Sequence, residues 1–409
     1  MFYPDNFDYV VALLIGVFGL LLGSAQANAL RMNRALSIIF VITVFALGYL
    51  RFWNDVDQDV DSVGYYIRSL YGEPFDIGTS FVPFFTRLFT QVLDLTYFTT
   101  TAVYCLSTIL TVQLFFMAFM RVGGQYLGTL WQAAFVVLVM TSVGFWGSAI
   151  SKDSFVFLGV AMCCWAFTKP TGRIWLICAG VLLVTLVRPH IAALLIAAVG
   201  IATLFGRDGR LTDRLLAAIL GVVATIILVP VIINYIGFGE LESIEELTTH
   251  VEAYNTSFEN TAGYVDLTEL SFPMQVLTYL FRPFPWEAGS ALQLAAAAQN
   301  MMLMAAVLLT ATSLFRRTAH LRSSQQLFFL IFALLGLVLL AMTSANLGIT
   351  TRQKWTIVLP MLLALVHSWA SAKAPSLLRK AEQRARIKAA RAGHTIPVAQ
   401  RHPQSVRRA

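Results

Sequence analysis

The sequence predicts an all-α, polytopic integral membrane protein, a helix bundle with about eleven transmembrane helices and short helices in its external loops. Two observations favour this fold class. Of the 409 residues, 57% are hydrophobic and only 12% are charged, a composition outside the range of soluble domains. The apolar residues are also gathered in long runs, as the hydrocarbon core of a membrane requires.

The apolar runs give the positions of the expected spans. A helix that crosses a hydrocarbon core about 30 Å thick needs roughly 20 apolar residues. Three of the runs are shorter, so they are expected to tilt, to extend into polar flanks or to enter the membrane only partly. The expected spans are 9–25, 35–50, 97–119, 129–147, 154–168, 174–187, 190–205, 215–236, 289–315, 327–344 and 355–370.

Lysine and arginine indicate the orientation of these spans, because both concentrate in cytoplasmic connections. With the N-terminus outside and the C-terminus in the cytoplasm, most of the 29 basic residues fall on the cytoplasmic side. Eight cations depart from the bias and lie near the outer ends of spans: Arg51, Arg68, Arg87, Lys152, Arg188, Arg282, Arg352 and Lys354.

This orientation divides the chain into a transmembrane catalytic domain, residues 1–370, and a basic cytoplasmic tail, residues 371–409. The two longest connections, about 51–96 and 237–288, face outward, and 81–93 is expected to form a helix in the membrane interface or one that dips into the membrane. The tail has too few large apolar residues for a core, so we expect it to be largely disordered and attracted to membrane lipids. Nucleic acid is not an expected partner, since the net charge of +7 is spread over connections rather than gathered on one polar domain.

An acidic cluster opens the first external connection. Asp55, Asp57, Asp59 and Asp61 recur at every second position, so an extended backbone would direct their carboxylates to one side. Paired carboxylates bind divalent cations or act as general bases. Asp61 is the best candidate for a base, with Asp57, Asp59 and the nearby Tyr65 as substrate-binding residues. A divalent metal at the three aspartates 57, 59 and 61 is possible chemically but not favoured, and no cofactor is expected.

The same segment has a simpler interpretation. It is then a solvated loop in which Asp61 or Ser62 caps a short helix that runs to Arg68. The two interpretations differ in where the carboxylates point, because an extended strand and a helix start direct their side chains differently.

Two motifs combine charge with the outer end of a span. Lys152 and Asp153 begin the fifth span, where a lysine and free backbone amides can hold an anion, although the aspartate also suits an ordinary first turn. Arg188 and His190 flank a proline between the sixth and seventh spans. The guanidinium fork matches phosphate, and histidine can move a proton near neutral pH. The alternative is that Arg188 only extends to the interface.

Two further motifs place cations at the start of a span. In FRPFPWE, residues 281–287, Arg282 lies among aromatic residues that include Trp286, which suits a sugar face with an anionic group. An aromatic belt with an anchoring arginine is the alternative. Arg352 and Lys354 precede the last span, where they can contact substrate or anchor lipid headgroups.

Missing motifs count against several classes of protein. The sequence has no Walker A loop, no HExxH, no GxSxG and no CxxC pair, so ATP-driven transport, zincin proteolysis and thiol redox chemistry lack support. Ion-coupled transport is also disfavoured, because few charged residues lie deep inside the expected spans.

Taken in order, the motifs follow a two-helix start: DxDS-x-x-x-Y at 59–66, SKDS at 151–154, RPH at 188–190, FRPFPWE at 281–287 and NLGI-x-x-RQ at 346–353. This pattern, over most of residues 1–370, resembles the bacterial polysaccharide polymerases of the Wzy and EpsG type, which are related in architecture to GT-C glycosyltransferases. The resemblance implies transfer of a lipid-linked glycan to a lipid-linked acceptor at the outer, periplasmic face of the bacterial inner membrane. Undecaprenyl diphosphate would be the leaving group, and exopolysaccharide, capsule or O-antigen the product.

The resemblance also implies roles for residues. Arg188, Arg282 and Arg352 would hold the diphosphate, and Asp61 or His190 would deprotonate the attacking hydroxyl. The acidic cluster follows the second span, whereas GT-C enzymes usually carry their acidic motif after the first, so the chain departs from that pattern. The implied partners are lipid-linked glycans, a chain-length regulator and export proteins. Alternatives are a GT-C transferase that uses a polyprenyl-phosphate sugar, an O-antigen-type ligase, and a transporter or flippase for a lipid-linked glycan.

Overall fold

The computed structural model describes residues 3–58, 60–169, 172–206, 263–316 and 323–372, with isolated positions between 212 and 261. This part of the chain is helical and contains no strand. Seven helices are long and apolar enough to cross a membrane, which supports the expected class of all-α membrane protein. They are Asn6–Leu30, Arg34–Asp55, Tyr97–Val122, Thr129–Gly147, Ala291–Thr310, Ser324–Thr343 and Trp355–Ala372.

Each of these helices overlaps an expected span. The three short expected spans correspond to α8 (Lys152–Phe167), α9 (Ile174–Val187) and α10 (Pro189–Phe205). The expected span 215–236, most of the connection 237–262 and the tail 373–409 lie outside the described residues. The count of about eleven crossings therefore stays a prediction.

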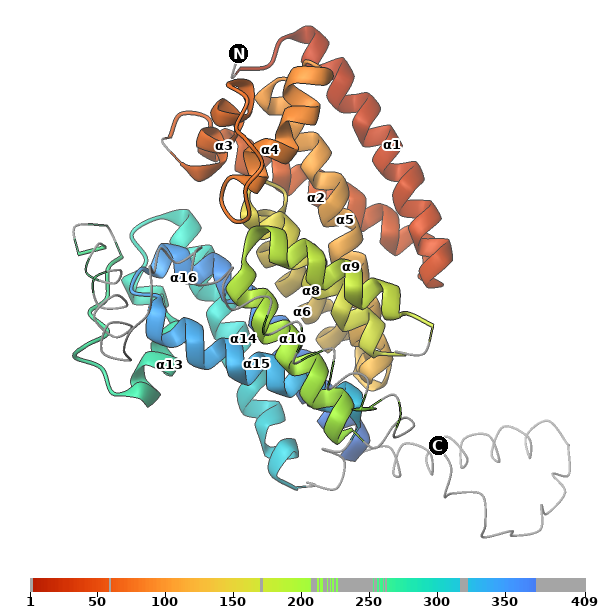
Figure 1. The fold of residues 1–409 in the computed structure, drawn as a ribbon, viewed down its shortest axis with the longest axis vertical. Helices are drawn as coiled ribbons and strands as arrows, with labels where there is room; N and C mark the ends of the chain where they lie inside the picture. Colours follow the sequence, from red (N-terminus) through yellow and green to blue (C-terminus); the bar gives the residue numbers. More distant parts are fainter. Residues whose placement is uncertain are drawn as a thin grey trace, which may run out of the picture.

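Helix α5 (Tyr97–Val122) is central in the N-terminal half of the bundle, where it packs against α1 (Asn6–Leu30), α2 (Arg34–Asp55) and α8. Helix α8 in turn packs on α9, α9 on α10, and α10 on α15 (Ser324–Thr343). In Figure 1, α1 lies at one edge and α14 (Ala291–Arg316) and α15 lie beyond α9 and α10. The short helices therefore connect the two halves of the bundle.

Local sequence determines several helix ends. Asp5 forms a capping box with Asp8 at the start of α1, and Thr96 accepts a hydrogen bond from the amide of Thr99 at the start of α5. The Thr96 hydroxyl also donates to Asp8 at 2.7 Å, which ties the two helix starts together. Gly123, with φ of 138°, ends α5 in a conformation that favours glycine.

The connection between α2 and α5 contains α3 (Asp61–Leu70), α4 (Phe81–Arg87) and a π-helical turn (Leu88–Val92). The prediction of a helix at 81–93 is confirmed. Apart from Gln91, its exposed residues are apolar, as suits an interfacial or re-entrant helix: Phe84, Phe85, Leu88, Val92 and Leu93. Figure 1 shows α3 and α4 at the end of the bundle that also holds the N-terminus.

The remaining helices also include short and irregular segments between the long ones. Helix α6 (Thr129–Val139) continues through a π-helical segment (Met140–Gly144) into α7 (Phe145–Gly147). Two short helices, α13 (Phe272–Phe281) and α16 (Leu347–Gln353), and a 3₁₀ turn (Pro285–Glu287) stand beside the long α14 and α15. The segments before α13 and before α16 are joined by an isolated β-bridge between Tyr264 and Asn346.

Helices α8 and α9 touch through their backbones. A Cβ atom added at Gly159 would lie 2.6 Å from the carbonyl oxygen of Gly180, and one added at Gly180 would lie 2.5 Å from the carbonyl oxygen of Gly159. Small residues allow this approach between membrane helices. The antiparallel pair brings the first turn of α8 beside the last turn of α9, where Asp153 and Arg188 meet.

We expect Gly159→Ala to destabilise the protein, because the added methyl group meets a backbone atom that cannot turn away. Overpacking of this kind costs about 1–3 kcal/mol. Gly16→Ala on α1 is the matched control, since a Cβ atom there has nothing within 4 Å. Thermal unfolding of the purified variants measures the difference, and equal melting temperatures would contradict the close contact.

Candidate functional site

A buried ion pair lies where α8, α9 and α10 meet. Asp153, in the first turn of α8, is 2% exposed, and Arg188, between α9 and α10, is 4% exposed. Arg188 Nη2 donates to Asp153 Oδ1 at 2.7 Å. Pro189 begins α10, so the chain turns at Arg188 and directs its side chain back to α8. An unpaired charge at this depth would cost several kcal/mol, and the pairing removes most of that penalty.

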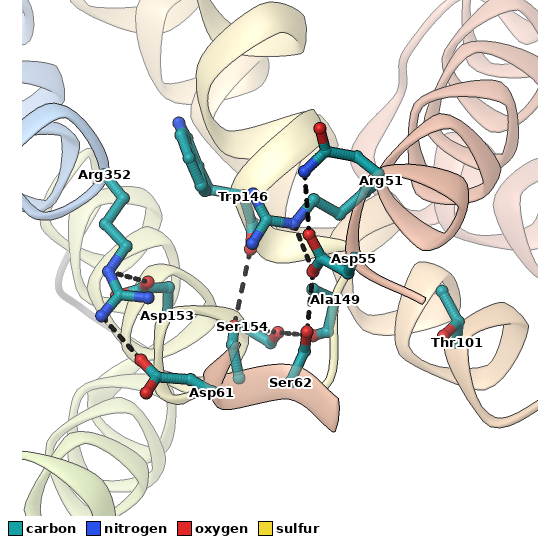
Figure 2. A network of polar contacts seen from close by, with 12 residues as sticks. Arg51, Asp55, Asp61, Ser62, Thr101, Trp146, Ala149, Asp153, Ser154 and Arg352 are labelled. Carbon is teal, nitrogen blue, oxygen red and sulfur yellow. Dashed lines mark hydrogen bonds and ion pairs between the residues drawn. The ribbon is translucent and has the colours of Figure 1, made fainter. Parts of the chain in front are cut away.

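Arg352 extends this pair into a chain of four charges. It lies in the last turn of α16, and its Nη2 donates to Asp61 Oδ2 at 2.8 Å. Its Nε is 3.7 Å from Asp153 Oδ2, an ion-pair distance that is too long for a hydrogen bond. Figure 2 shows the guanidinium between Asp61 and Asp153. The order is therefore Arg188, Asp153, Arg352, Asp61, from four separate segments of the chain.

The four charged side chains differ sharply in solvent exposure. The side chains of Arg188 and Asp153 are 5% and 3% exposed, whereas those of Arg352 and Asp61 are 20% and 51% exposed. Exposed ion pairs contribute little free energy and exchange easily, while buried pairs are hard to break. The Arg352–Asp61 end is thus the one that a charged ligand can reach and replace.

The cluster carries an excess of positive charge. Lys152, whose amino group donates to Thr79 Oγ1 at 3.3 Å, acts electrostatically on Asp61 together with both arginines. Burial alone would raise the pKa of Asp61, but the Arg352 guanidinium, helped by Lys152 and Arg188, holds it below its ordinary value. Asp61 is therefore ionised at neutral pH and is a weak proton acceptor.

Two tyrosines border the cluster. Tyr65 is buried on α3, where burial and then the Asp61 carboxylate raise the pKa of its hydroxyl. Tyr279, on α13, is 2% exposed, and within the described residues its hydroxyl has no hydrogen-bond partner. Arg188 and Asp153 both lie within electrostatic range of that hydroxyl. Sequence reasoning missed Tyr279; its position two residues before FRPFPWE was the only available signal.

A second network lies directly beside the first. Arg51 Nε donates to Asp55 Oδ2 at 2.7 Å, and the same oxygen accepts from Ser62 Oγ at 2.7 Å. Tyr97 donates to Ser62 at 3.1 Å, and the Arg51 guanidinium stacks 4.6 Å from the Trp146 ring centre. In Figure 2, Ser62 points to Asp55 while the preceding Asp61 points to Arg352. Two consecutive residues at the start of α3 therefore connect both networks.

The expected acidic array is wrong in its geometry. Asp55 is fully buried as the last residue of α2, and Asp57 lies in the following turn, where it accepts a hydrogen bond from the Tyr3 hydroxyl. Asp59 lies outside the described residues. The chain is a helix end, a turn and a helix start rather than an extended strand, so the carboxylates diverge. In the described segments, no three acidic, histidine or cysteine side chains gather as metal ligands.

The expected helix cap is also wrong, although the helix itself is present. Helix α3 runs past Arg68 as predicted, but no side chain caps its start. Ser62 instead donates to Asp55 and Asp61 pairs with Arg352, because both partners are charged. Ser151 similarly precedes α8 without a side-chain cap.

Lys354 is a buried structural cation rather than a headgroup anchor. Its side chain is inaccessible, and Nζ donates to Asn300 Oδ1 and, at 3.3 Å each, to the carbonyl oxygens of Leu280 and Arg282. These contacts join α13, α14 and the last helix. The expectation that Lys354 faces substrate or lipid is therefore wrong.

Arg282 and Trp286, both predicted from FRPFPWE, have contacts within that motif. Arg282 pairs with Glu287 at 2.8 Å, and the exposed Trp286 stacks on Phe284 at 4.8 Å between ring centres. His190, at the start of α10, lies within electrostatic range of Arg188 and Lys152.

The arrangement suits an anion with several oxygens. Two guanidinium groups and one ammonium group face two carboxylates, and arginine forks match phosphate oxygens in pairs. The exposed Asp61 can yield its place to such a ligand, while the buried Asp153 keeps both arginines aligned.

Comparison of the chain with protein-family models, with curated proteins and with solved structures gives no match. The chemistry is therefore inferred from the cluster itself.

We expect Asp153→Asn to lower stability strongly, since it leaves two arginines near an uncharged amide in a buried position. Breaking a buried ion pair costs about 3–5 kcal/mol. Asp57→Asn, the same change at an exposed aspartate, should have little effect. Thermal unfolding and protease resistance of both variants test this. Similar stability of the two variants would show that the buried pair is not a structural element.

Proposed function

We propose that this protein is a membrane glycosyltransferase that polymerises undecaprenyl-diphosphate-linked repeat units into exopolysaccharide, capsule or O-antigen. The observation that carries the proposal is the cluster in which Arg188 and Arg352 flank Asp153, with Lys152 beside them. A diphosphate leaving group needs fixed cations at the membrane surface. The resemblance of the motifs to Wzy- and EpsG-type polymerases supplies the glycan and the lipid.

The proposed setting is the bacterial inner membrane, with the N-terminus in the periplasm. The cations Arg188, Arg352 and Lys152 are among those that depart from the positive-inside bias. Placed outside, they meet lipid-linked repeat units at the periplasmic face. The basic tail then lies in the cytoplasm.

Donor binding begins in this proposal with the diphosphate replacing Asp61 on the exposed side of Arg352. Arg188 remains bound to Asp153, so the positive field is already in place when the substrate arrives. Lys152 adds a third positive charge on the same side. The Tyr279 hydroxyl, which lacks a partner among the described residues, is free to donate to a phosphate oxygen.

Transfer then forms a bond between the acceptor hydroxyl oxygen and the anomeric carbon of the donor. The bond from that carbon to the diphosphate oxygen breaks, and its electron pair leaves with the diphosphate, where the cations stabilise the charge. The hydroxyl proton goes in this proposal to a ring nitrogen of His190, at the start of α10 beside Arg188. Asp61 is the alternative proton acceptor, although the Arg352 guanidinium holds the pKa of its carboxyl below the ordinary value.

We expect Arg352→Gln to reduce polymer at least about 100-fold in the bacterium that carries the chain, the usual effect of removing one transition-state donor. Arg352→Lys should retain part of the activity, since it keeps the charge but loses the fork. Arg87→Gln, on α4, is the control, because Arg87 bonds only Gln91 and the Glu73 carbonyl among the described residues.

The lipid-linked intermediates identify the reaction class. Single repeat units that accumulate on the periplasmic face support a polymerase. Units trapped on the cytoplasmic face indicate a flippase, and truncated units indicate a transferase of single sugars. Complete polymer that fails to reach its final acceptor indicates a ligase. Normal polymer in both Arg352 variants would remove the cluster as the site.

We also expect Asp61→Asn to strengthen the binding of inorganic pyrophosphate, because the carboxylate competes for Arg352. An exposed ion pair is worth about 0.2–1 kcal/mol, which corresponds to an affinity gain of up to about fivefold. Asp57→Asn makes the same change of net charge outside the cluster. Calorimetric titration of the purified proteins compares them, and an equal gain in both variants would mean that net charge alone is responsible.

A further inference from the structure

A second cationic site lies at the opposite end of α8 from Asp153. It is a cavity of about 330 Å³ at the C-terminal ends of α1, α5 and α8 and the start of α9. Trp165 forms part of its wall, about 18 Å along the helix from Asp153 at 1.5 Å per residue. The cavity is lined by Ala29, Leu30, Arg31, Met117, Arg121, Trp165, Lys169 and Arg173.

Four cations line this cavity without an acidic residue. Arg31, Arg121, Lys169 and Arg173 come from three different connections of the chain. In the described ranges, none of them has a carboxylate within ion-pair distance. Burial and then the nearby Arg121 lower the pKa of Arg173, as expected for cations that repel each other.

Two of the cations are held in place by Trp165. The Arg173 guanidinium carbon is 4.1 Å from the centre of the Trp165 ring, and that of Arg121 is 5.1 Å away. Arg173 Nη1 also donates to the Trp165 carbonyl at 3.0 Å and to Thr168 Oγ1 at 3.1 Å. These contacts fix the guanidinium groups without neutralising them.

The helix ends compensate only part of this charge. Each helix C-terminus is equivalent to roughly half a negative charge and the start of α9 to roughly half a positive one, so the helix ends supply about −1 against four positive charges. A positive-inside bias explains why the cations lie on one side of a membrane, but it does not require them to converge on one cavity. The excess of about three positive charges calls for an anionic ligand.

We propose that this cavity binds the phosphate group of an anionic membrane phospholipid. The phosphate would lie among Arg31, Arg121 and Lys169, with Arg173 behind it. The apolar wall formed by Leu30 and Met117 would contact the start of an acyl chain. A cavity of about 330 Å³ accommodates such a headgroup, and basic pockets between membrane helices are suited to one.

The test uses the full chain reconstituted in phosphatidylcholine nanodiscs. Addition of phosphatidylglycerol should raise the melting temperature by several degrees, and native mass spectrometry should retain bound phosphatidylglycerol. Inorganic phosphate is titrated in parallel. Stabilisation by phosphatidylglycerol alone supports the lipid. Equal stabilisation by inorganic phosphate overturns it in favour of a small-anion site, and no preference over phosphatidylcholine overturns the site itself.

Variants assign the effect to the cavity. Arg121→Gln combined with Arg173→Gln should weaken phosphatidylglycerol binding at least tenfold. Lys169→Gln, at an exposed residue of the lining, is a milder change should the double variant fail to fold, and should weaken binding by several fold. Arg34→Gln removes an exposed cation outside the lining and should have no effect. Unchanged binding in both lining variants overturns the proposal. Every variant keeps the basic tail, so a difference between variants cannot come from binding of lipid to the tail.

Discussion

The buried pair of Arg188 and Asp153 holds together the end of the bundle where the chemistry is proposed. Neither charge is stable alone at that depth, so each requires the other, and the turn between α9 and α10 must remain against the first turn of α8. The backbone contact between Gly159 and Gly180 makes this register possible. Arg352 then joins through Asp153 and brings the C-terminal half of the chain to the same place.

Much of the fold could be predicted from sequence, because lipid imposes a strong rule. Only a helix satisfies every backbone hydrogen bond within hydrocarbon, so a long apolar run identifies its own structure. The runs that became α1, α2 and α5 needed no knowledge of neighbours. Lys354 shows the limit of this reasoning, because its burial depends on Asn300 and on two carbonyl groups from α13 and the residue after it. Positive charge at a span end does not reveal what covers it.

The sequence allowed us to predict which residues belong to the site, but not which of them contact each other. Asp61, Asp153, Arg188 and Arg352 were each singled out by residue type and by their place at an outer span end. Their mutual pairing could not be predicted, because no local sequence pattern relates residues that are 35 or 291 positions apart. The prediction that the alternating aspartates share one side failed for a physical reason. Helix α2 continues to Asp55, and a helix end directs successive side chains differently from a strand.

The start of α3 has a mechanical consequence. Its first residue faces the exposed cation Arg352, and its second is held by the buried carboxylate of Asp55. Because Asp61 and Ser62 share one peptide unit, a rotation of α3 that frees the first side chain also pulls on the second. The first turn of α3 is thus tied to α16 on one side and to the end of α2 on the other.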